Sequence, residues 1–427
     1  MAEKIAFFLG SGCSRLSGQP MVGDLTSDML TRELYLIEAL DDQSALHYGL
    51  DRSYPRWGTL EELQAFDPIK TAEQLVPWRT PAASIQAFLR YISELPSWRR
   101  EPNYEDVCGL LNVIAGAYRR STNDPLINRI LEEHHIVDKL AAIEFPPNHR
   151  YLKMDPAEQL MVIEDFVGWL VAKRIQIAPP LNGYEAFAFA VNGLRERGYL
   201  SHFITTNYDC NIERLLTQMK VPFHDGFPSN RYLDDAGRSW RVGNHLAFFG
   251  ARSSALMKLH GSINWFRTHD MLGSDAGIFA VSDPQLSPED GFKASIHIPP
   301  CAFTSKHSPE MLRGSMSKAH VYAYGIYAEL FLAFEIALSR ARLVVVAGFG
   351  WNDEGIAARL MRFAQAEGKK LLILDGSEAA PAVVANNWTN PHFFGDVNDG
   401  TQVSIHRQHM SSMKGDELLA MISKLLD

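Results

Sequence analysis

Four short apolar runs place the strongest constraint on the fold of this 427-residue chain. They cover residues 5–9, 200–205, 343–347 and 371–374, and none of them alternates regularly between apolar and polar side chains. Runs of this kind are typical of strands that are buried on both faces of a parallel sheet. The segment ALMKLHG at residues 255–261 is a fifth, more mixed candidate.

Helical patterns lie beside these runs. Residues 182–198 precede the second run, 210–220 follow it, 324–341 precede the third run and 353–368 follow that one, with Gly368 as the expected C-cap. Strands that alternate with helices indicate βαβ units. The sequence therefore predicts an α/β fold with a parallel sheet.

A long segment between the first two runs has a different character. From about residue 30 to residue 180 we expect helices and no strong strand, which indicates a helical insertion. The residues between 221 and 254 and between 267 and 320 are rich in Gly, Pro, Asp and Ser, and we expect long loops with short hairpins there. The helix-like segments are residues 26–40, 80–95, 104–120, 123–143 and 157–175.

Charge and cysteine content exclude several kinds of protein. A formal net charge of -9 argues against a broad nucleic-acid face, because phosphate binding needs clustered Lys and Arg. The four cysteines have no metal-ligand spacing, so we expect neither a zinc ribbon nor any other metal site. No apolar run is long enough for a signal peptide or a membrane span. We therefore expect a cytoplasmic protein.

The first candidate site follows the first apolar run and contains Gly10, Ser11, Gly12 and Ser14. Glycines let the backbone approach a phosphate closely, and nearby N–H groups can then face its oxygens. The third glycine of the dinucleotide fingerprint is missing, so this turn alone fits a purely structural role equally well.

Two further motifs follow strand candidates. In Thr206-Asn207-Tyr208-Asp209, helix capping explains either Asn207 or Asp209, but it does not explain both. His260 precedes a glycine at the end of the fifth candidate strand. A lone histidine is more often a core residue than a catalyst, but its proton exchange lies near neutral pH.

The last two motifs lie late in the chain. Gly348 and Gly350 repeat the pattern of a strand, a Gly-x-Gly turn and a helix, and Asp353 is a candidate N-cap. Asp375 ends the last apolar run, where an acidic residue can bind ribose hydroxyls or cap a turn with Gly376.

Taken together and in this order, the motifs resemble the sirtuin-like family, named for silent-information-regulator proteins. The resemblance covers the Gly10 loop through Pro20, then Thr206–Asp209, His260-Gly261 and Gly348–Gly350. It implies a Rossmann-like parallel sheet of the sirtuin type. The implied organisation is an NAD-binding domain formed by residues 1–29 and 190–427, with a helical insertion domain at residues 30–189.

Two departures distinguish the chain from protein-deacylating sirtuins. The zinc ribbon is absent, and Met21-Val22-Gly23-Asp24 stands where those enzymes carry Asp-Phe-Arg. The chain looks more like the bacterial sirtuin-like effectors, also in IPPCAFTSKHS at residues 298–308. That branch implies hydrolysis of NAD+ to nicotinamide and ADP-ribose in antiphage defence. It also implies a partner, with a HerA-type ATPase ranked before an Argonaute relative. From the size and position of the insertion and the long loops we expect a homo-oligomer.

The resemblance also implies roles for single residues, with NAD+ as the substrate. Asn207 orients the ribose hydroxyls and the attacking water, Asp209 holds the nicotinamide carboxamide, and His260 is the general base. Asp375 takes an adenosine hydroxyl. Three other readings stay open: a protein deacylase or ADP-ribosyltransferase, a sensor that binds NAD or ADP-ribose without turnover, and, more distantly, an oxidoreductase. The remaining expected NAD contacts are Gly10, Ser11, Gly12, Ser14, Pro20, Thr206, Gly348 and Gly350.

Overall fold

A computed structural model gives the architecture of the chain, which divides into two compact units. The first unit contains residues 1–21, 172–312 and 318–427, and the second contains residues 22–171 and 313–317. The structure describes residues 4–31, 35–37, 56–58, 76–77, 88–90, 92–94, 101–111, 167–168, 170–172, 174–175, 179–234, 237–243, 246–248, 254–270, 275–281, 295–298, 301–305, 309–314, 318, 322–323, 325–376 and 402–427.

The boundaries of these units differ from the domain boundaries predicted from the sequence. Residues 22–29 belong to the second unit and residues 172–189 to the first. The assignment of one part as an NAD-binding domain and of the other as an insertion domain stays a prediction.

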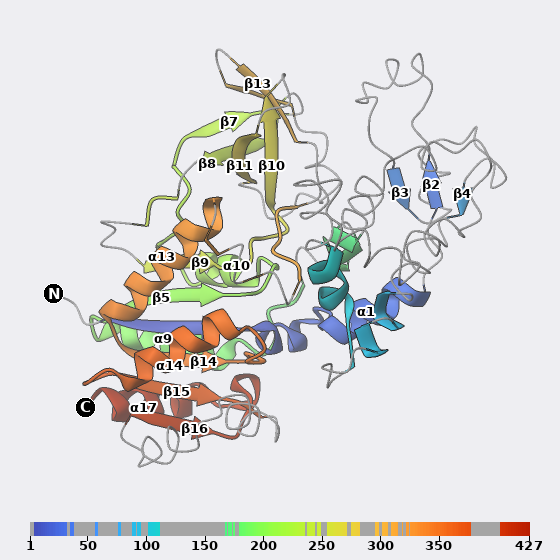
Figure 1. The fold of residues 1–427 in the computed structure, drawn as a ribbon. Helices are drawn as coiled ribbons and strands as arrows, with labels where there is room; N and C mark the ends of the chain where they lie inside the picture. The colour runs from blue at the N-terminus through green and yellow to red at the C-terminus, as the bar shows by residue number, and fades with distance from the viewer. Residues whose placement is uncertain are drawn as a thin grey trace. The chain divides into compact units, whose positions relative to one another are not determined.

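A seven-stranded parallel sheet forms the centre of the first unit (Figure 1). All four apolar runs and the mixed fifth candidate are strands of this sheet, so the predicted α/β fold with a Rossmann-like parallel sheet is confirmed. Two short edge strands, β6 and β16, were not predicted. The strands are β1 (Lys4–Leu9), β5 (Leu200–Thr205), β6 (Phe223–His224), β9 (Ser254–Lys258), β14 (Ala341–Ala347), β15 (Lys370–Leu374) and β16 (Val403–His406).

The spatial order of the strands is β16-β15-β14-β1-β5-β9-β6. When β1, β5, β9, β14, β15 and β16 are numbered one to six, this is the order 3-2-1-4-5-6 with β6 added at one edge. That order is typical of doubly wound sheets that bind dinucleotides. The winding direction reverses between β1 and β14, and ligands of such sheets lie outside the carboxyl ends of the strands at that point.

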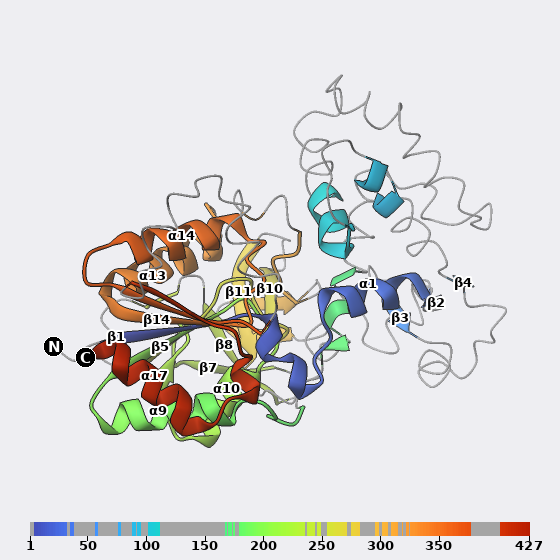
Figure 2. The same ribbon diagram turned by 90° about the horizontal axis from the view of Figure 1, so that it is seen from below.

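Helices cover both faces of the sheet (Figure 2). Alternate residues of β1 explain this, because Phe7 packs with α9, α10 and α17, whereas Phe8 packs with α13 and α14. Helix α17 was not predicted, and α14 ends too early for Gly368 to be its C-cap, which is Ala366. The helices are α9 (Glu185–Glu196), α10 (Asn211–Gln218), α13 (Gly325–Arg340), α14 (Glu354–Gln365) and α17 (Gly415–Leu426). Among the helices that the structure describes, none is long and apolar enough to cross a bilayer.

The segments predicted as long loops form a second, antiparallel sheet of six strands in the order β12-β13-β10-β11-β8-β7. Its edge strands β12 and β7 contact each other, so the sheet curves back on itself. Hairpins are visible in a sequence through their turns, but their assembly depends on pairings between distant segments. The strands are β7 (Arg231–Leu233), β8 (Ser239–Gly243), β10 (Trp265–Asp270), β11 (Asp275–Val281), β12 (Ser295–Ile298) and β13 (Cys301–Ser305).

The second unit contains strands that the sequence did not predict. A three-stranded sheet joins β3 (Arg56–Gly58), β2 (Tyr35–Ile37) and β4 (Val76–Pro77), so the expectation of helices alone is wrong. Tyr35-Leu36-Ile37 lies in a segment that was predicted to be helical, although aromatic and β-branched residues favour strands. The helical residues described here are α1 (Val22–Thr31) and residues 88–90, 92–94, 104–111, 167–168 and 170–171, which fall partly within the predicted helices at 26–40, 80–95, 104–120 and 157–175. The predicted helix at 123–143 lies outside the described residues.

One buried histidine of the sheet gives a prediction about stability. His202 on β5 is 7% exposed, and its Nδ1 accepts a hydrogen bond of 3.2 Å from the Ala255 N–H group. Burial, aided by the positive charges of Lys4 and Arg340, lowers the pKa of His202 from 6.5 to about 4. The neutral form therefore belongs to the folded state, and stability is lost as the pH falls from about 6.5 towards 4.

We expect the free energy of unfolding to be about 2 kcal/mol lower at pH 5 than at pH 8. The reason is that His202 binds a proton at pH 5 in the unfolded chain but stays neutral in the folded chain. Urea titrations followed by circular dichroism measure this difference. His202→Gln should reduce it, since an amide oxygen can still accept from Ala255, whereas His409→Gln at an exposed position should not. An unchanged pH dependence in His202→Gln would contradict the assignment.

Candidate functional site

All five sequence motifs lie along one edge of the parallel sheet. The last residues of five neighbouring strands stand side by side in register. This row is Leu374, Ala347, Leu9, Thr205 and Lys258. Directly after it, in the same order, come Asp375, Gly348, Gly10, Thr206 and the pair Leu259-His260. The fold therefore brings the motifs to the carboxyl edge, where a ligand of such a sheet lies.

The loops after β1 and β14 touch each other through glycine backbone. A Cβ atom added to Gly10 would lie 2.4 Å from the Gly348 carbonyl oxygen, and one added to Gly12 would lie 2.9 Å from the Gly348 Cα. Gly348 itself has a φ of +62°, and its Cβ would meet the Cys13 nitrogen at 2.5 Å. No side chain fits at these three positions, and the two loops can approach only because all three are glycines.

The same contact involves several N–H groups of the Gly10 loop. The N–H groups of Gly10 and Gly12 donate to the carbonyls of Ala347 and Gly348 at 2.9 and 3.0 Å, and the Ser14 N–H donates to Ser11 at 3.0 Å. These three donors are used within the protein, because the chain turns at once into short 3₁₀ helices, η1 (Ser11–Cys13) and η2 (Arg15–Ser17). The predicted contact of this loop with a phosphate stays a prediction.

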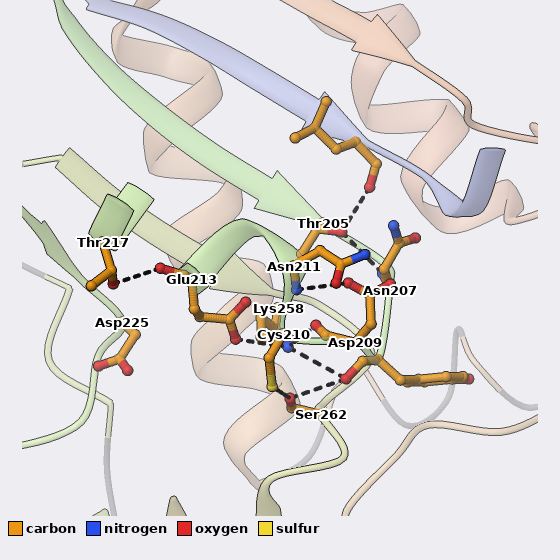
Figure 3. A network of polar contacts seen from close by, with 12 residues as sticks. Thr205, Asn207, Asp209, Cys210, Asn211, Glu213, Thr217, Asp225, Lys258 and Ser262 are labelled. Carbon is orange, nitrogen blue, oxygen red and sulfur yellow. Dashed lines mark hydrogen bonds and ion pairs between the residues drawn. The ribbon is translucent and has the colours of Figure 1, made fainter. Parts of the chain in front are cut away.

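Asn207 is fixed by hydrogen bonds to the Gly10 loop. Its Nδ2 donates to the Gly10 carbonyl at 3.0 Å and to Ser14 Oγ at 2.9 Å, and the residue is 6% exposed. Thr205 supports this position, since its Oγ1 accepts from the Asn207 N–H and donates to the Leu9 carbonyl (Figure 3). Within the part of the chain that the structure describes, Asn207 Oδ1 is buried and has no hydrogen-bond partner. Such an acceptor is costly unless a ligand or water supplies a donor.

Asp209 resolves the capping question raised by the sequence. Its Oδ1 accepts from the Asn211 N–H at 3.0 Å at the start of α10, so Asp209 and not Asn207 serves that helix (Figure 3). The Asp209 carboxylate lies close enough to Cys13 and Tyr184 for its charge to affect both. Burial and then the charge of Asp209 raise the pKa of Cys13 to about 12 and the pKa of Tyr184 well above its usual value. Cys13 is therefore an unreactive thiol.

A buried lysine holds the backbone of this loop. Lys258 Nζ donates to the carbonyl of Asp209 at 2.5 Å and pairs with Glu213 Oε1 at 2.8 Å (Figure 3). Burial alone would lower the pKa of Lys258, but the negative charge of Glu213 outweighs it and raises the pKa, so the ammonium stays charged. The sequence analysis assigned no role to Lys258. The available signal was a lone cation inside the buried strand ALMKLHG.

His260 lies at the end of the next strand and contacts two polar side chains. It is 5% exposed, and its Nε2 lies 3.0 Å from Tyr322 Oη and 3.1 Å from Asp353 Oδ2. Asp353 also caps α14 as predicted, because its Oδ1 accepts from the Ile356 N–H at 3.1 Å. The contacts of Asp353 and Tyr322 with His260 were not predicted, since the spacing along the chain does not indicate them.

The other predicted site residues lie at varied depths. Ser11 and Gly350 are exposed, whereas Pro20 and Thr206 are half-buried. Asp375 follows β15, which β14 separates from β1, and its N–H donates to the His406 carbonyl at 3.0 Å. Their contacts with a ligand stay predictions. Across the described ranges, no group of three or more His, Cys, Asp or Glu side chains could hold a metal ion.

Comparisons with known proteins give a distant likeness only. No protein-family model and no curated protein matches the chain. Among solved structures it is similar to a triple mutant of a Sir2 homologue in complex with 2′-O-acetyl ADP ribose, with 14% identity and a TM-score of 0.36 over 100% of this chain and 94% of that chain. Two single mutants of a Sir2 homologue in complex with ADP ribose have 16% identity and TM-scores of 0.35, over 66% of this chain and 85% of theirs. A likeness of this degree carries no information about the site of this chain.

The glycine contact gives a prediction with a matched control in the facing loop. Gly10→Ala should lower the free energy of unfolding by about 1–3 kcal/mol, because the new methyl group overlaps the backbone of Gly348. Gly350→Ala should change it by less than about 0.5 kcal/mol, since its Cβ meets nothing closer than 3.6 Å. Thermal unfolding of both variants checks this. Equal stability of the two would mean that the loops separate at little cost.

Proposed function

We propose that this chain is an NAD+ glycohydrolase that cleaves NAD+ to nicotinamide and ADP-ribose. The observation that carries the proposal is the buried, unpartnered Oδ1 of Asn207 at the carboxyl edge of the sheet. The strand order 3-2-1-4-5-6 supports a dinucleotide at that edge. A site that only bound a dinucleotide through backbone groups would need neither this acceptor nor the adjacent His260.

The orientation of the Asn207 amide follows from its partners. The Gly10 carbonyl can only accept, so the amide nitrogen faces it and the oxygen faces away. A donor from outside the described protein groups must therefore satisfy Oδ1, and a ribose hydroxyl or the attacking water has the required O–H. An unpartnered amide oxygen is not unique to this residue, since Asn192, Asn211 and Asn264 have one as well. Asn207 differs in that it follows the end of β5 by two residues and its amide nitrogen is bound to the Gly10 loop.

The proposed reaction begins with cleavage of the bond between ribose C1′ and the nicotinamide nitrogen, which keeps the electron pair. The ribose passes through an oxocarbenium-like state, as in glycoside cleavage generally. The oxygen of water then bonds to C1′, and its proton passes to His260 as the general base. Help of this kind contributes about 10²–10⁴-fold to the rate. His260 releases the proton to solvent afterwards.

The remaining assignments place the other parts of NAD+. Asp209 would hold the nicotinamide carboxamide through Oδ2, because Oδ1 already serves α10. The pyrophosphate would lie against the exposed Ser11 and Gly350, and Asp375 would accept from an adenosine hydroxyl.

We further propose that this activity depletes NAD+ in bacterial defence against phage, through a homo-oligomer and with a HerA-type ATPase as the first candidate partner. The support is the resemblance of the motif set to the bacterial sirtuin-like effectors. A tightly controlled activity also fits the chemistry, since unregulated loss of NAD+ would harm the cell that makes the enzyme.

Incubation of the purified chain with NAD+, followed by chromatography of nicotinamide and ADP-ribose, tests the enzymatic proposal. Asn207→Ala should reduce turnover by about 10²-fold or more, because the reacting ribose or water loses its fixed acceptor. Asn192→Ala is the matched control and should keep turnover within about twofold. Binding of NAD+ without turnover by the wild-type chain would favour the sensor reading, and neither binding nor turnover would refute both.

Measurement of NAD+ in bacteria that express the chain tests the defence role separately. We expect NAD+ to fall after phage infection in cells with the wild-type chain and to persist in cells with Asn207→Ala. Steady NAD+ through infection by a panel of phages, together with hydrolysis by the purified chain, would reject the defence role and keep the enzyme.

A further inference from the structure

Asp353 makes more contacts than a helix cap requires. Its Oδ1 accepts from the Ile356 N–H, which is the complete capping interaction. Its Oδ2 is directed elsewhere, to His260 Nε2 at 3.1 Å and to the Tyr322 hydroxyl, which donates to it. Because α14 fixes one oxygen and His260 contacts the other, the carboxylate joins the helix to the histidine.

The segment that leads into Asp353 is held in an unusual conformation. Trp351 has a φ of +58°, in the left-handed region that bulky residues rarely adopt, and it is 4% exposed. Such a conformation persists only where the surroundings determine it, and it occurs often at functional sites. The position of Asp353 relative to His260 is therefore set by the fold and not by a mobile side chain.

The Asp353 carboxyl group is ionised at neutral pH. Its side chain is 7% exposed, and burial alone would raise its pKa. The hydrogen bond and charge of His260, the charge of Lys318 and the Tyr322 hydroxyl outweigh burial and hold the pKa well below its usual value. An ionised carboxylate can only accept hydrogen bonds, so the proton between the two groups resides on His260 Nε2.

We propose that Asp353 is a positioning residue that holds His260 with its proton on Nε2 and stabilises the imidazolium formed when His260 accepts a proton. The catalytic part of this proposal rests on the hydrolase function proposed above. The nitrogen that accepts a proton is then Nδ1, and Asp353 stays ionised throughout. An asparagine at this position would cap α14 equally well. The negative charge of Asp353 is therefore not required for capping, and we assign it to the interaction with His260.

His260 and Asp353 have three further described neighbours, which are two tyrosines and a lysine. Tyr322 is neutral, and its ring stacks on the imidazole with 6.3 Å between centroids, while the Tyr208 ring lies at 6.5 Å. Lys318 is a cation whose charge lowers the pKa of Asp353. Among the described residues Asp353 is the carboxylate that pairs with the imidazole, so its removal should make His260 harder to protonate.

The test uses the full chain labelled with ¹⁵N-histidine and long-range ¹H–¹⁵N spectra from pH 5 to pH 9, with His260→Gln to assign the signal. We expect the wild-type signal to be that of the Nε2–H tautomer. In Asp353→Asn, which keeps the cap, the pH at which the signal titrates should fall by about one unit. Asp416→Asn, at an exposed position in the first turn of α17, should leave it unchanged.

Kinetics supply the second measurement. Asp353→Asn should lower kcat at least tenfold while KM changes less than threefold, and the acid limb of the pH–rate profile should move to lower pH. An Nδ1–H tautomer in the wild-type chain would overturn the proposal, even if Asp353→Asn did not fold. An unchanged titration and an unchanged kcat in a folded Asp353→Asn would also overturn it. If the wild-type chain hydrolyses no NAD+, the hydrolase function fails, and the spectra still decide how Asp353 acts on His260.

Discussion

The backbone contact between the loops after β1 and β14 is the constraint on which the candidate site depends. Gly10, Gly12 and Gly348 meet without side chains between them, and two backbone hydrogen bonds join the loops. The position of Asn207 follows from this contact, since its amide binds the Gly10 carbonyl and Ser14. The glycines thus form the supporting frame for polar side chains, in addition to any direct contact that the loop makes with a ligand.

The sequence predicted the parallel sheet well because buried parallel strands are apolar throughout, and that signal is local. It also predicted which residues follow the strands, and hence the edge at which the motifs meet. It failed where structure depends on distant pairing. The six-stranded antiparallel sheet joins segments on both sides of β9 in the chain, and the pairing of Asp353 with His260 spans 93 positions. No local pattern in the sequence encodes either of them.

Two histidines show how place in the fold changes the chemistry of one residue type. His202 lies inside β5, where burial, aided by the positive charges of Lys4 and Arg340, keeps it neutral, and its Nδ1 accepts from a backbone N–H group. His260 lies beyond the end of β9, and its Nε2 contacts the Asp353 carboxylate. Both are buried, and both follow or interrupt an apolar strand, so the sequence alone does not separate them. The neighbours of each imidazole, which only the fold assembles, distinguish the two.

The buried ion pair of Lys258 with Glu213 has a consequence for the order in which the chain folds. An ammonium group that enters the interior without its carboxylate loses its hydration, and for Lys258 only the backbone carbonyls of Tyr208 and Asp209 would replace it. Lys258 is on β9 and Glu213 is on α10, so adding β9 to the sheet before α10 has formed would be strongly unfavourable. The two elements must assemble together with β5. This segment of the sheet then forms one cooperative folding unit, and its amide hydrogens should exchange with solvent through a single shared opening event.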